Sequence, residues 1–312
     1  MKPTIFITNL TKYYGKFLAV DNLSLAVKKG EILGFVGLNG AGKTTTIKML
    51  LGLIAPTAGE CFLLGKKVSA GNTRIWRDVG YIVEKPYAYP ELTVKENLEI
   101  VSKLRGIKAR GAVDRVIKEL NLADHASKKA GHLSEGNNQR LGLAKAIIHR
   151  PAILLLDEPT NGLDPAGVVQ VRQLLLDLAV NFSVTVLLSS HQLDELSRIA
   201  TNLVIIHEGK LIKQIEGKEL EGKLKKTLVL DGKNPAAMQS ILCEAGYSPR
   251  LLKNNHETEL TVPDEMAINN PDRIAALLVK AGHSPTFLKV EQESWEKYFL
   301  RIIAETGMEK NG

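Results

Sequence analysis

Residues 37–44, which read GLNGAGKT, constrain the fold and chemistry of this chain more than any other stretch. They match the pattern G-x-x-x-x-G-K-S/T in full, and they stand between a strand-like run, ILGFV, and a helix expected over about residues 43–53. Glycines let the backbone pass close to a ligand, so that successive N–H groups and the helix N-terminus point at phosphate oxygens. The motif predicts a nucleoside-triphosphate site in an α/β fold, and its context disfavours a merely flexible glycine turn.

The residues expected to handle phosphate and Mg²⁺ come from two strand ends. Lys43 is expected to reach the β- and γ-phosphates, and the Thr44 hydroxyl to ligate Mg²⁺. A second apolar run, AILLLDEP, ends in Asp157 and Glu158. Apolar runs without alternation are typical of parallel strands buried on both faces, and ligands bind where such strands end. Asp157 is expected to hold Mg²⁺ through water, and Glu158 to polarise the attacking water.

His191 follows a further apolar run, residues 184–188, and lies 33 residues after Glu158. A lone histidine is more often an ordinary surface or core residue. Here it ends the strand expected beside the one that carries Glu158. We therefore expect His191 to touch the γ-phosphate and to sense its loss.

The turn LSEGNNQR, residues 133–140, has the character of an anion site at a helix N-terminus. Ser134 is a good N-cap, and a helical run is expected over residues 137–148. Glu135, however, places a negative charge where an anion would lie. The stretch alone leaves open which anion it faces.

The remaining pattern predicts two domains, residues 1–217 and 218–312. Strands are expected at residues 4–8, 18–27, 32–36, 153–156 and 184–188, a hairpin at 204–206 and 211–214, and mostly helix over 86–150. Beyond residue 217, EAGYSP at 244–249 recurs as KAGHSP at 280–285. This indicates a small α+β domain of two similar halves, although helices ending in glycine are common enough for chance similarity.

Composition narrows the classes of partner and compartment. The net charge of +7 over 312 residues fits either a nucleic-acid partner or nearby anionic lipid headgroups. Because the charge comes without an arginine cluster, no nucleic-acid partner is expected. Two cysteines without metal-like spacing indicate a reduced, cytoplasmic compartment. The first ten residues lack a signal-peptide core, and no apolar run approaches the ~20 residues of a membrane span, so the chain is not expected to cross a bilayer.

The motifs GLNGAGKT, LSEGNNQR, ILLLDEPTNGLDP and SSH, in this order, resemble the ATP-binding subunit of ABC transporters over residues 4 to about 217. The resemblance implies a P-loop ATPase domain with a mostly parallel sheet, an antiparallel β subdomain and a helical subdomain over residues 86–150. It also implies ATP and Mg²⁺ as cofactors, hydrolysis coupled to transport, and a peripheral position on the cytoplasmic face of the cell membrane. The partners implied are a membrane permease on separate chains and a second ATP-binding subunit, identical or pseudo-symmetric.

The resemblance also assigns roles to residues. Tyr14 in KYYG corresponds to the aromatic that stacks on adenine, with Tyr13 as the fallback. Asp164 belongs to the loop at residues 161–164 that crosses to the partner, and the family's head-to-tail dimer places Ser134 and Gly136 at the γ-phosphate held by the other subunit. That phosphate is the anion that the turn would face. The implied phosphate loop comprises Gly37, Leu38, Asn39, Gly40, Ala41, Gly42, Lys43, Thr44 and Thr45.

Two departures from the family pattern bear on activity. The family usually has LSGGQ, whereas this chain has Glu135 and Asn137 in place of Gly and Gln. We expect an active site, because an outward-pointing Glu135 would leave its N–H free to donate; the competing interpretation is a weakened site. Glu84 replaces the usual Gln, which bridges Mg²⁺ and the membrane partner, and a carboxylate can also ligate Mg²⁺.

The sequence around Glu84, IVEKPYAYPELT, resembles the branch that exports bacitracin and lantibiotics; the alternative is a neutral substitution in another export branch. The leading hypothesis is the ATPase of a drug or peptide-antibiotic exporter. The alternative is a soluble ABC ATPase with a regulatory or nucleic-acid-linked role. Lys43 and Ser134 are only 91 residues apart, which leaves no room for the long coiled coil of DNA-repair types. Ribosome-acting types carry two ATPase units in one chain, whereas this chain carries one. Glu158, the expected water-activating residue, is evidence against a regulator that does not hydrolyse ATP.

Overall fold

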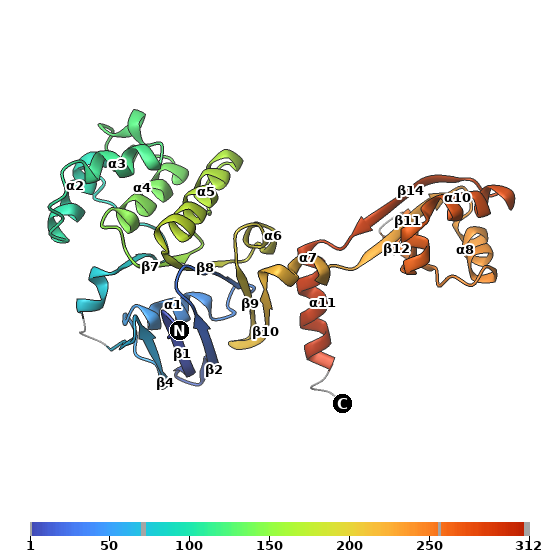
Figure 1. The fold of residues 1–312 in the computed structure, drawn as a ribbon, viewed down its shortest axis with the longest axis horizontal. Coiled ribbons are helices and arrows are strands. Elements are labelled where there is room, and N and C mark those ends of the chain that lie inside the picture. Colours follow the sequence, from blue (N-terminus) through green and yellow to red (C-terminus); the bar gives the residue numbers. More distant parts are fainter. Residues whose placement is uncertain (1, 70–72, 255–256, 309–312) are drawn as a thin grey trace. The chain divides into compact units, whose positions relative to one another are not determined.

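The chain divides into two compact units in the computed structural model, which describes residues 2–69, 73–254 and 257–308 (Figure 1). The first unit comprises Met1–Lys218 and Ile302–Gly312, and the second comprises Glu219–Arg301. Helix α11 (Trp295–Met308) is therefore split between the units. The expectation that residues 218–312 form one accessory domain stays a prediction.

A six-stranded sheet of order β10-β9-β3-β8-β7-β6 forms the centre of the first unit. Its five parallel strands are β3, β6, β7, β8 and β9, and β10 closes the edge as an antiparallel hairpin with β9. The strand bounds are β3 (Ile32–Val36), β6 (Val79–Ile82), β7 (Ile153–Asp157), β8 (Thr185–Ser190), β9 (Asn202–His207) and β10 (Lys210–Glu216). Every residue of β3, β7 and β8 is buried, which confirms the mostly parallel sheet.

The register of this sheet brings the functional segments to one edge. Val36 pairs with Ser190 across β3 and β8, and Asp157 pairs with Ser189 across β7 and β8. The chain therefore leaves all three strands at the same level. The phosphate loop, the acidic pair at 157–158 and His191 all follow these strand ends.

A four-stranded antiparallel sheet of order β2-β1-β4-β5 forms the second layer. Its strands are β1 (Ile5–Tyr14), β2 (Phe17–Val27), β4 (Ala58–Leu63) and β5 (Lys66–Lys67). The prediction of a strand over residues 4–8 was too short, because β1 continues past irregularities in its pairing at Leu10 and Lys12. Ile5, Ile7 and Leu25 of this sheet share one buried core with Phe35 and Leu155 of the central sheet.

Helices α2 (Val94–Leu104), α3 (Ala112–Glu119) and α4 (Glu135–Ile147) confirm the helical subdomain expected over residues 86–150. The first unit also contains α1 (Lys43–Leu50), α5 (Pro165–Phe182), α6 (Leu193–Ser197) and the last part of α11. Helix α1 ends before the predicted residue 53, because Gly52 has a φ of +66° and the Leu53 N–H donates back to the Lys48 carbonyl. Helices in the described ranges all lack the length and apolarity needed to cross a membrane.

Helix α4 begins two residues earlier than predicted. The Ser134 side chain accepts a hydrogen bond from the Asn137 N–H and so caps the helix. Glu135 therefore lies in the first turn, where a carboxylate interacts favourably with the positive end of the helix dipole. The negative charge that seemed misplaced in the sequence has a local stabilising role.

The second unit is a small α+β domain, as predicted. Its sheet has the order β12-β13-β11-β14 and is antiparallel throughout. The elements are α7 (Leu220–Lys223), β11 (Lys226–Gly232), α8 (Pro235–Glu244), β12 (Arg250–Asn254), β13 (Glu257–Val262), α9 (Glu265–Asn269), α10 (Pro271–Lys280) and β14 (Pro285–Gln292). The repeated GYSP and GHSP segments follow α8 and α10, where Gly246 and Gly282 adopt φ angles of +85° and +78°. Each segment thus lies between the helix and the second strand of a strand–helix–strand half, β11-α8-β12 or β13-α10-β14.

The contact between β6 and α4 gives a test of the packing. A Cβ built on Gly80 would lie 2.0 Å from the carbonyl oxygen of Ala146 on α4. We expect Gly80→Ala to lower the free energy of unfolding by about 2 kcal/mol, because backbone atoms must move to relieve the overlap. Urea unfolding measures the change. Gly222→Ala, where a Cβ meets nothing within 4 Å, is the control. Equal stability of Gly80→Ala and the wild type would contradict this close packing.

Candidate functional site

The phosphate loop runs from β3 into α1 over residues 37–45, and packing fixes both ends of its glycine-rich part. A Cβ on Gly37 would lie 2.7 Å from the Ile206 carbonyl oxygen, and one on Gly42 would lie 2.6 Å from that of Ala19. Gly42 also has a φ of +101°, which strains any other residue. Between these anchors residues 38–40 are exposed, so a ligand can approach them.

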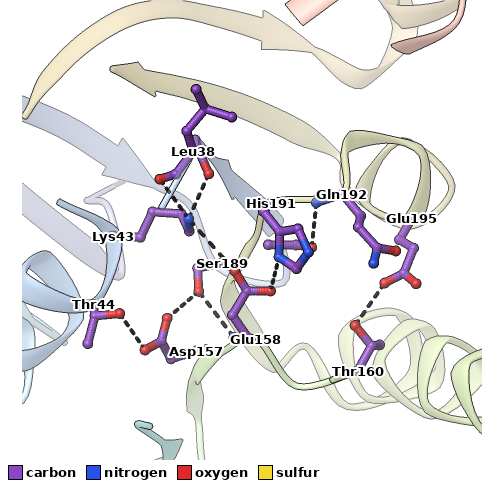
Figure 2. Close-up of polar contacts among 12 residues, drawn as sticks. Leu38, Lys43, Thr44, Asp157, Glu158, Thr160, Ser189, His191, Gln192 and Glu195 are labelled. Carbon is purple, nitrogen blue, oxygen red and sulfur yellow. Dashed lines mark hydrogen bonds and ion pairs between the residues drawn. The ribbon is translucent and has the colours of Figure 1, made fainter. Parts of the chain in front are cut away.

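Lys43 lies within this loop as a buried cation. Its Nζ donates to the carbonyl oxygens of Gly37 at 2.6 Å and Leu38 at 3.3 Å, and lies 3.7 Å from Oε1 of Glu158 (Figure 2). Burial lowers the pKa of Lys43, while the charges of Glu158 and Asp157 act in the opposite direction. The ammonium is thus held by the residues that a triphosphate would approach.

Asp157 connects three elements at the edge of the sheet. Its Oδ2 accepts from the Thr44 hydroxyl at 2.7 Å, and its Oδ1 accepts from the Ser189 hydroxyl at 2.5 Å. The carboxylate is 5% exposed, so these bonds offset much of the cost of burying its charge. The expected closeness of Thr44 and Asp157 is found. The sequence analysis predicted no role for Ser189, although this residue lies in the same SSH segment as His191.

Glu158 has an unusual backbone and a well-defined side chain. Its φ is +49°, in the left-handed region that costs a side-chain-bearing residue about 1–2 kcal/mol. Its N–H lies 3.2 Å from both the Oγ and the carbonyl oxygen of Ser189, and its Oε2 lies 3.0 Å from Nδ1 of His191 (Figure 2). The structure therefore places Glu158 and His191 together, with Lys43 on the other carboxylate oxygen.

Helix α4 contacts the loop that follows Glu158. The buried amide of Gln139 donates from Nε2 to the carbonyl oxygen of Glu158 at 3.2 Å. The first turn of α4 packs on Gly162, since a Cβ on Gly136 would lie 2.8 Å from the Gly162 carbonyl oxygen. A Cβ on Gly162 would lie 2.7 Å from Cγ of Glu135. The Glu135 side chain thus lies against this loop of its own chain. Gln139 was not predicted, and its only signal was its place in LSEGNNQR.

Ser134 and Asp164 both cap helices in this structure. The Ser134 oxygen accepts from Asn137 N–H, which leaves its own O–H free to donate elsewhere. The Asp164 carboxylate accepts from the Gly167 N–H at 3.1 Å and lies 3.4 Å from Nη2 of Arg140. Both are exposed, at the start of α4 and of α5 respectively.

The remaining predicted residues, Glu84, Tyr13 and Tyr14, make other contacts. The Glu84 carboxylate lies 2.5 Å from Nζ of Lys48, one helical turn beyond Thr44 on α1. Its role as a metal ligand therefore stays a prediction. Tyr13 and Tyr14 are 45% and 47% exposed, and Lys12 Nζ lies 5.2 Å from the centre of the Tyr14 ring. Both rings are open enough to stack on a planar ligand.

A basic groove of about 1030 Å³ is lined by β6 and helices α2, α3 and α4. Its lining includes eight lysines and arginines and, among the described residues, no aspartate or glutamate. Burial lowers the pKa of Lys145 to about 8, and its Nζ donates to the Tyr87 carbonyl and to Oδ1 of Asn97. Arg105 donates to the carbonyl oxygens of Trp76 and Val79. These two cations are solvated by neutral oxygens within the groove.

Comparisons with known proteins agree with this geometry. A family model described as ABC transporter matches residues 20–161. The bacitracin transport ATP-binding protein BcrA of Bacillus licheniformis is 45% identical over 73% of this chain and 74% of its own length. The lantibiotic transport ATP-binding protein SrtF of Streptococcus pyogenes is 34% identical over 68% of this chain and 92% of its own.

A solved structure gives the same result for the fold. The dimeric post-hydrolysis state of the ATP-binding cassette MJ0796, bound to ADP and Pi, superposes with a TM-score of 0.64 at 27% identity. The match covers 68% of this chain and 98% of that one. The extent and identity of these matches show that this chain belongs to the ATP-binding, ATP-hydrolysing subunits of ABC transporters.

Proposed function

We propose that this chain powers the export of a peptide antibiotic, with bacitracin as the first candidate substrate. The observation that carries the substrate class is the 45% identity to the bacitracin transport protein, together with the similarity to a lantibiotic transport protein. The residues at the nucleotide site supply the chemistry. A non-transport ATPase has no support among these relatives.

ATP is held by the phosphate loop, with its adenine on Tyr14 and its phosphates against the backbone of residues 37–45. The donor set beside the loop fits Mg²⁺, because the Thr44 hydroxyl and the Asp157 carboxylate are hard oxygen ligands that already lie 2.7 Å apart. When bound, the ion neutralises charge on the phosphates. Lys43 exchanges its two carbonyl partners for β- and γ-phosphate oxygens, which bear full negative charge and bind an ammonium more strongly.

Glu158 orients and deprotonates the attacking water. Its carboxylate is the group within reach of both Lys43 and His191, at 3.7 and 3.0 Å. Lys43 turns to the phosphates when ATP binds, which leaves one carboxylate oxygen to accept a proton from water. His191 holds the other oxygen and reports the loss of the γ-phosphate, since its ring lies at the end of β8 beside the acidic pair.

Two copies of the chain, or this chain and a close relative, complete each other's sites. The O–H of Ser134 and the backbone N–H groups at the start of α4 point their positive ends at an anion. In a head-to-tail dimer this anion is the γ-phosphate held by the other subunit, and Asp164 lies on the loop that crosses between them. Glu135 does not block this contact, because its side chain packs against Gly162.

The permease docks in the basic groove on the cytoplasmic face of the membrane. The groove combines apolar walls, such as Trp76 and Leu104, with the cations of Arg105 and Lys145, which donate to neutral oxygens. Desolvated cations gain most from a carboxylate that replaces such partners. An amphipathic, acidic segment of the permease fits this lining.

Glu158→Gln tests the chemistry and the substrate together. The variant keeps ATP binding but should hydrolyse ATP at least roughly a hundredfold more slowly, because the amide cannot take a proton from water. ATP-bound dimer should then accumulate on a sizing column. Wild-type chain produced with its permease should raise the bacitracin tolerance of a sensitive bacterium, and the variant should not. Protection against a lantibiotic but not bacitracin would reassign the substrate, and unchanged turnover would remove Glu158 from the mechanism.

Mixing two inactive variants tests the shared site. Lys43→Ala and Ser134→Arg each leave every homodimeric site incomplete. With random pairing roughly half of the dimers are mixed, and one site in each mixed dimer carries neither lesion, so about a quarter of the sites should return. ATPase activity above the sum of the separate variants is expected. No recovery, although differently tagged chains are shown to exchange, would contradict the shared site.

Charge reversal tests the groove. Lys108→Glu with Arg110→Glu changes two exposed lining residues, and should abolish copurification of the permease while ATP still raises the Tm of the isolated chain. The matched control is Lys28→Glu with Lys29→Glu, two exposed lysines in the turn between β2 and β3. Loss of the permease from both pairs of variants, or from neither, would contradict docking in the groove.

A further inference from the structure

We infer that Gln139 is a positioning residue for hydrolysis, and that it links the helix serving the neighbour's ATP to the Glu158 of its own chain. The inference rests on the proposed role of Glu158 and gives a role to a residue of LSEGNNQR that the expected roles left unassigned. Gln139 is 6% exposed, and its Nε2 lies 3.2 Å from the carbonyl oxygen of Glu158. A carbonyl oxygen only accepts, so the amide must present its N–H₂ there.

The backbone of Glu158 requires such support. Its left-handed φ of +49° is a conformation that persists only where surrounding contacts fix it. Ser189 fixes the peptide on the N-terminal side, through its Oγ and carbonyl oxygen. Gln139 and the Asn161 N–H fix the carbonyl on the C-terminal side, at 3.2 and 3.3 Å. The direction of the Glu158 carboxylate depends on both peptides.

The same helix carries the groups that face the other subunit. Ser134 caps α4, and Gly136 in its first turn packs on Gly162. Gln139 follows one turn later, and Arg140 lies 3.4 Å from the Asp164 carboxylate. Helix α4 therefore touches the segment 158–164 at three successive points. A shift of α4 on loss of the neighbour's γ-phosphate moves the Glu158 carbonyl with it, and so couples the two hydrolysis sites.

The loop is also held from the opposite side. The Thr160 hydroxyl donates to Oε2 of Glu195 on α6 at 2.8 Å (Figure 2). Glu195 follows His191 by four residues, so this bond ties the loop to the segment of the switch histidine. Without Gln139, Thr160 would still restrain the loop but would not set the Glu158 peptide. The expected defect is a misaimed carboxylate in a folded protein.

Gln139→Met and Gln139→Glu test this role in the full-length chain. Methionine matches the length without a polar amide, and glutamate keeps the shape but, in its ionised form, has no donor for the carbonyl oxygen. Both should lower kcat for ATP roughly ten- to hundredfold, as small misplacements of a catalytic group do, with KM within about twofold of wild type. The ATP-induced rise in Tm should stay unchanged, and the Hill coefficient for ATP should fall towards one.

Gln239→Met is the matched control, because the half-buried Gln239 on α8 also donates from Nε2 to a backbone carbonyl, that of Pro249 at 3.5 Å, and lies in the second unit away from α4. It should keep the wild-type kcat. Equal losses in the Gln139 and Gln239 variants, or an unchanged kcat in both Gln139 variants, would overturn the inference. Glu158→Gln in the same assays separates the proposed role of Glu158 from the inferred role of Gln139. If it is inactive while the Gln139 variants are normal, only the inference fails; if it is active, the proposed role of Glu158 fails first.

Discussion

The hydrogen bonds of the Asp157 carboxylate hold the nucleotide site together. One oxygen accepts from Thr44 at the start of α1, and the other accepts from Ser189 near the end of β8. A carboxylate buried at the end of β7 requires both partners, since an unpaired charge there would destabilise the fold. The same two bonds therefore satisfy a folding constraint and fix the loop, the acidic pair and His191, the proposed switch histidine, at one edge of the sheet.

Parallel strand order makes this arrangement possible. Strands β3, β8 and β7 are neighbours in the sheet. Lys43 follows β3 and Gln192 follows β8, although 149 residues separate the two in the chain. Each strand ends next to a residue with a proposed function: phosphate binding, γ-phosphate sensing and water activation. Because the strands are buried on both faces, their ends cannot shift independently. The side chains that are proposed to act on ATP are therefore positioned by the core rather than by their loops.

Helix α4 extends this rigid edge towards the surface that is proposed to face a second subunit. Its first turn faces outward with Ser134, and its second turn faces inward with Gln139 on the Glu158 carbonyl. Its far side lines the basic groove through Gly142, Lys145 and Ala146. One helix thus borders the three places where ATP, the neighbouring subunit and the permease are proposed to act. Movement of α4 offers a direct physical route between hydrolysis and transport.

The sequence by itself determined the strand–loop–helix around Lys43 and the buried strands that end in Asp157 and before His191. For the second unit it predicted two similar halves, with chance similarity as the alternative. Local signals suffice for these, because glycine spacing, apolar runs and helix caps act within a few residues. Only the tertiary structure decided that Glu158 is left-handed, that Glu84 pairs with Lys48, and that Gln139 supports the Glu158 carbonyl. Each of these depends on contacts between segments distant along the chain, and such packing leaves no periodic pattern in the sequence.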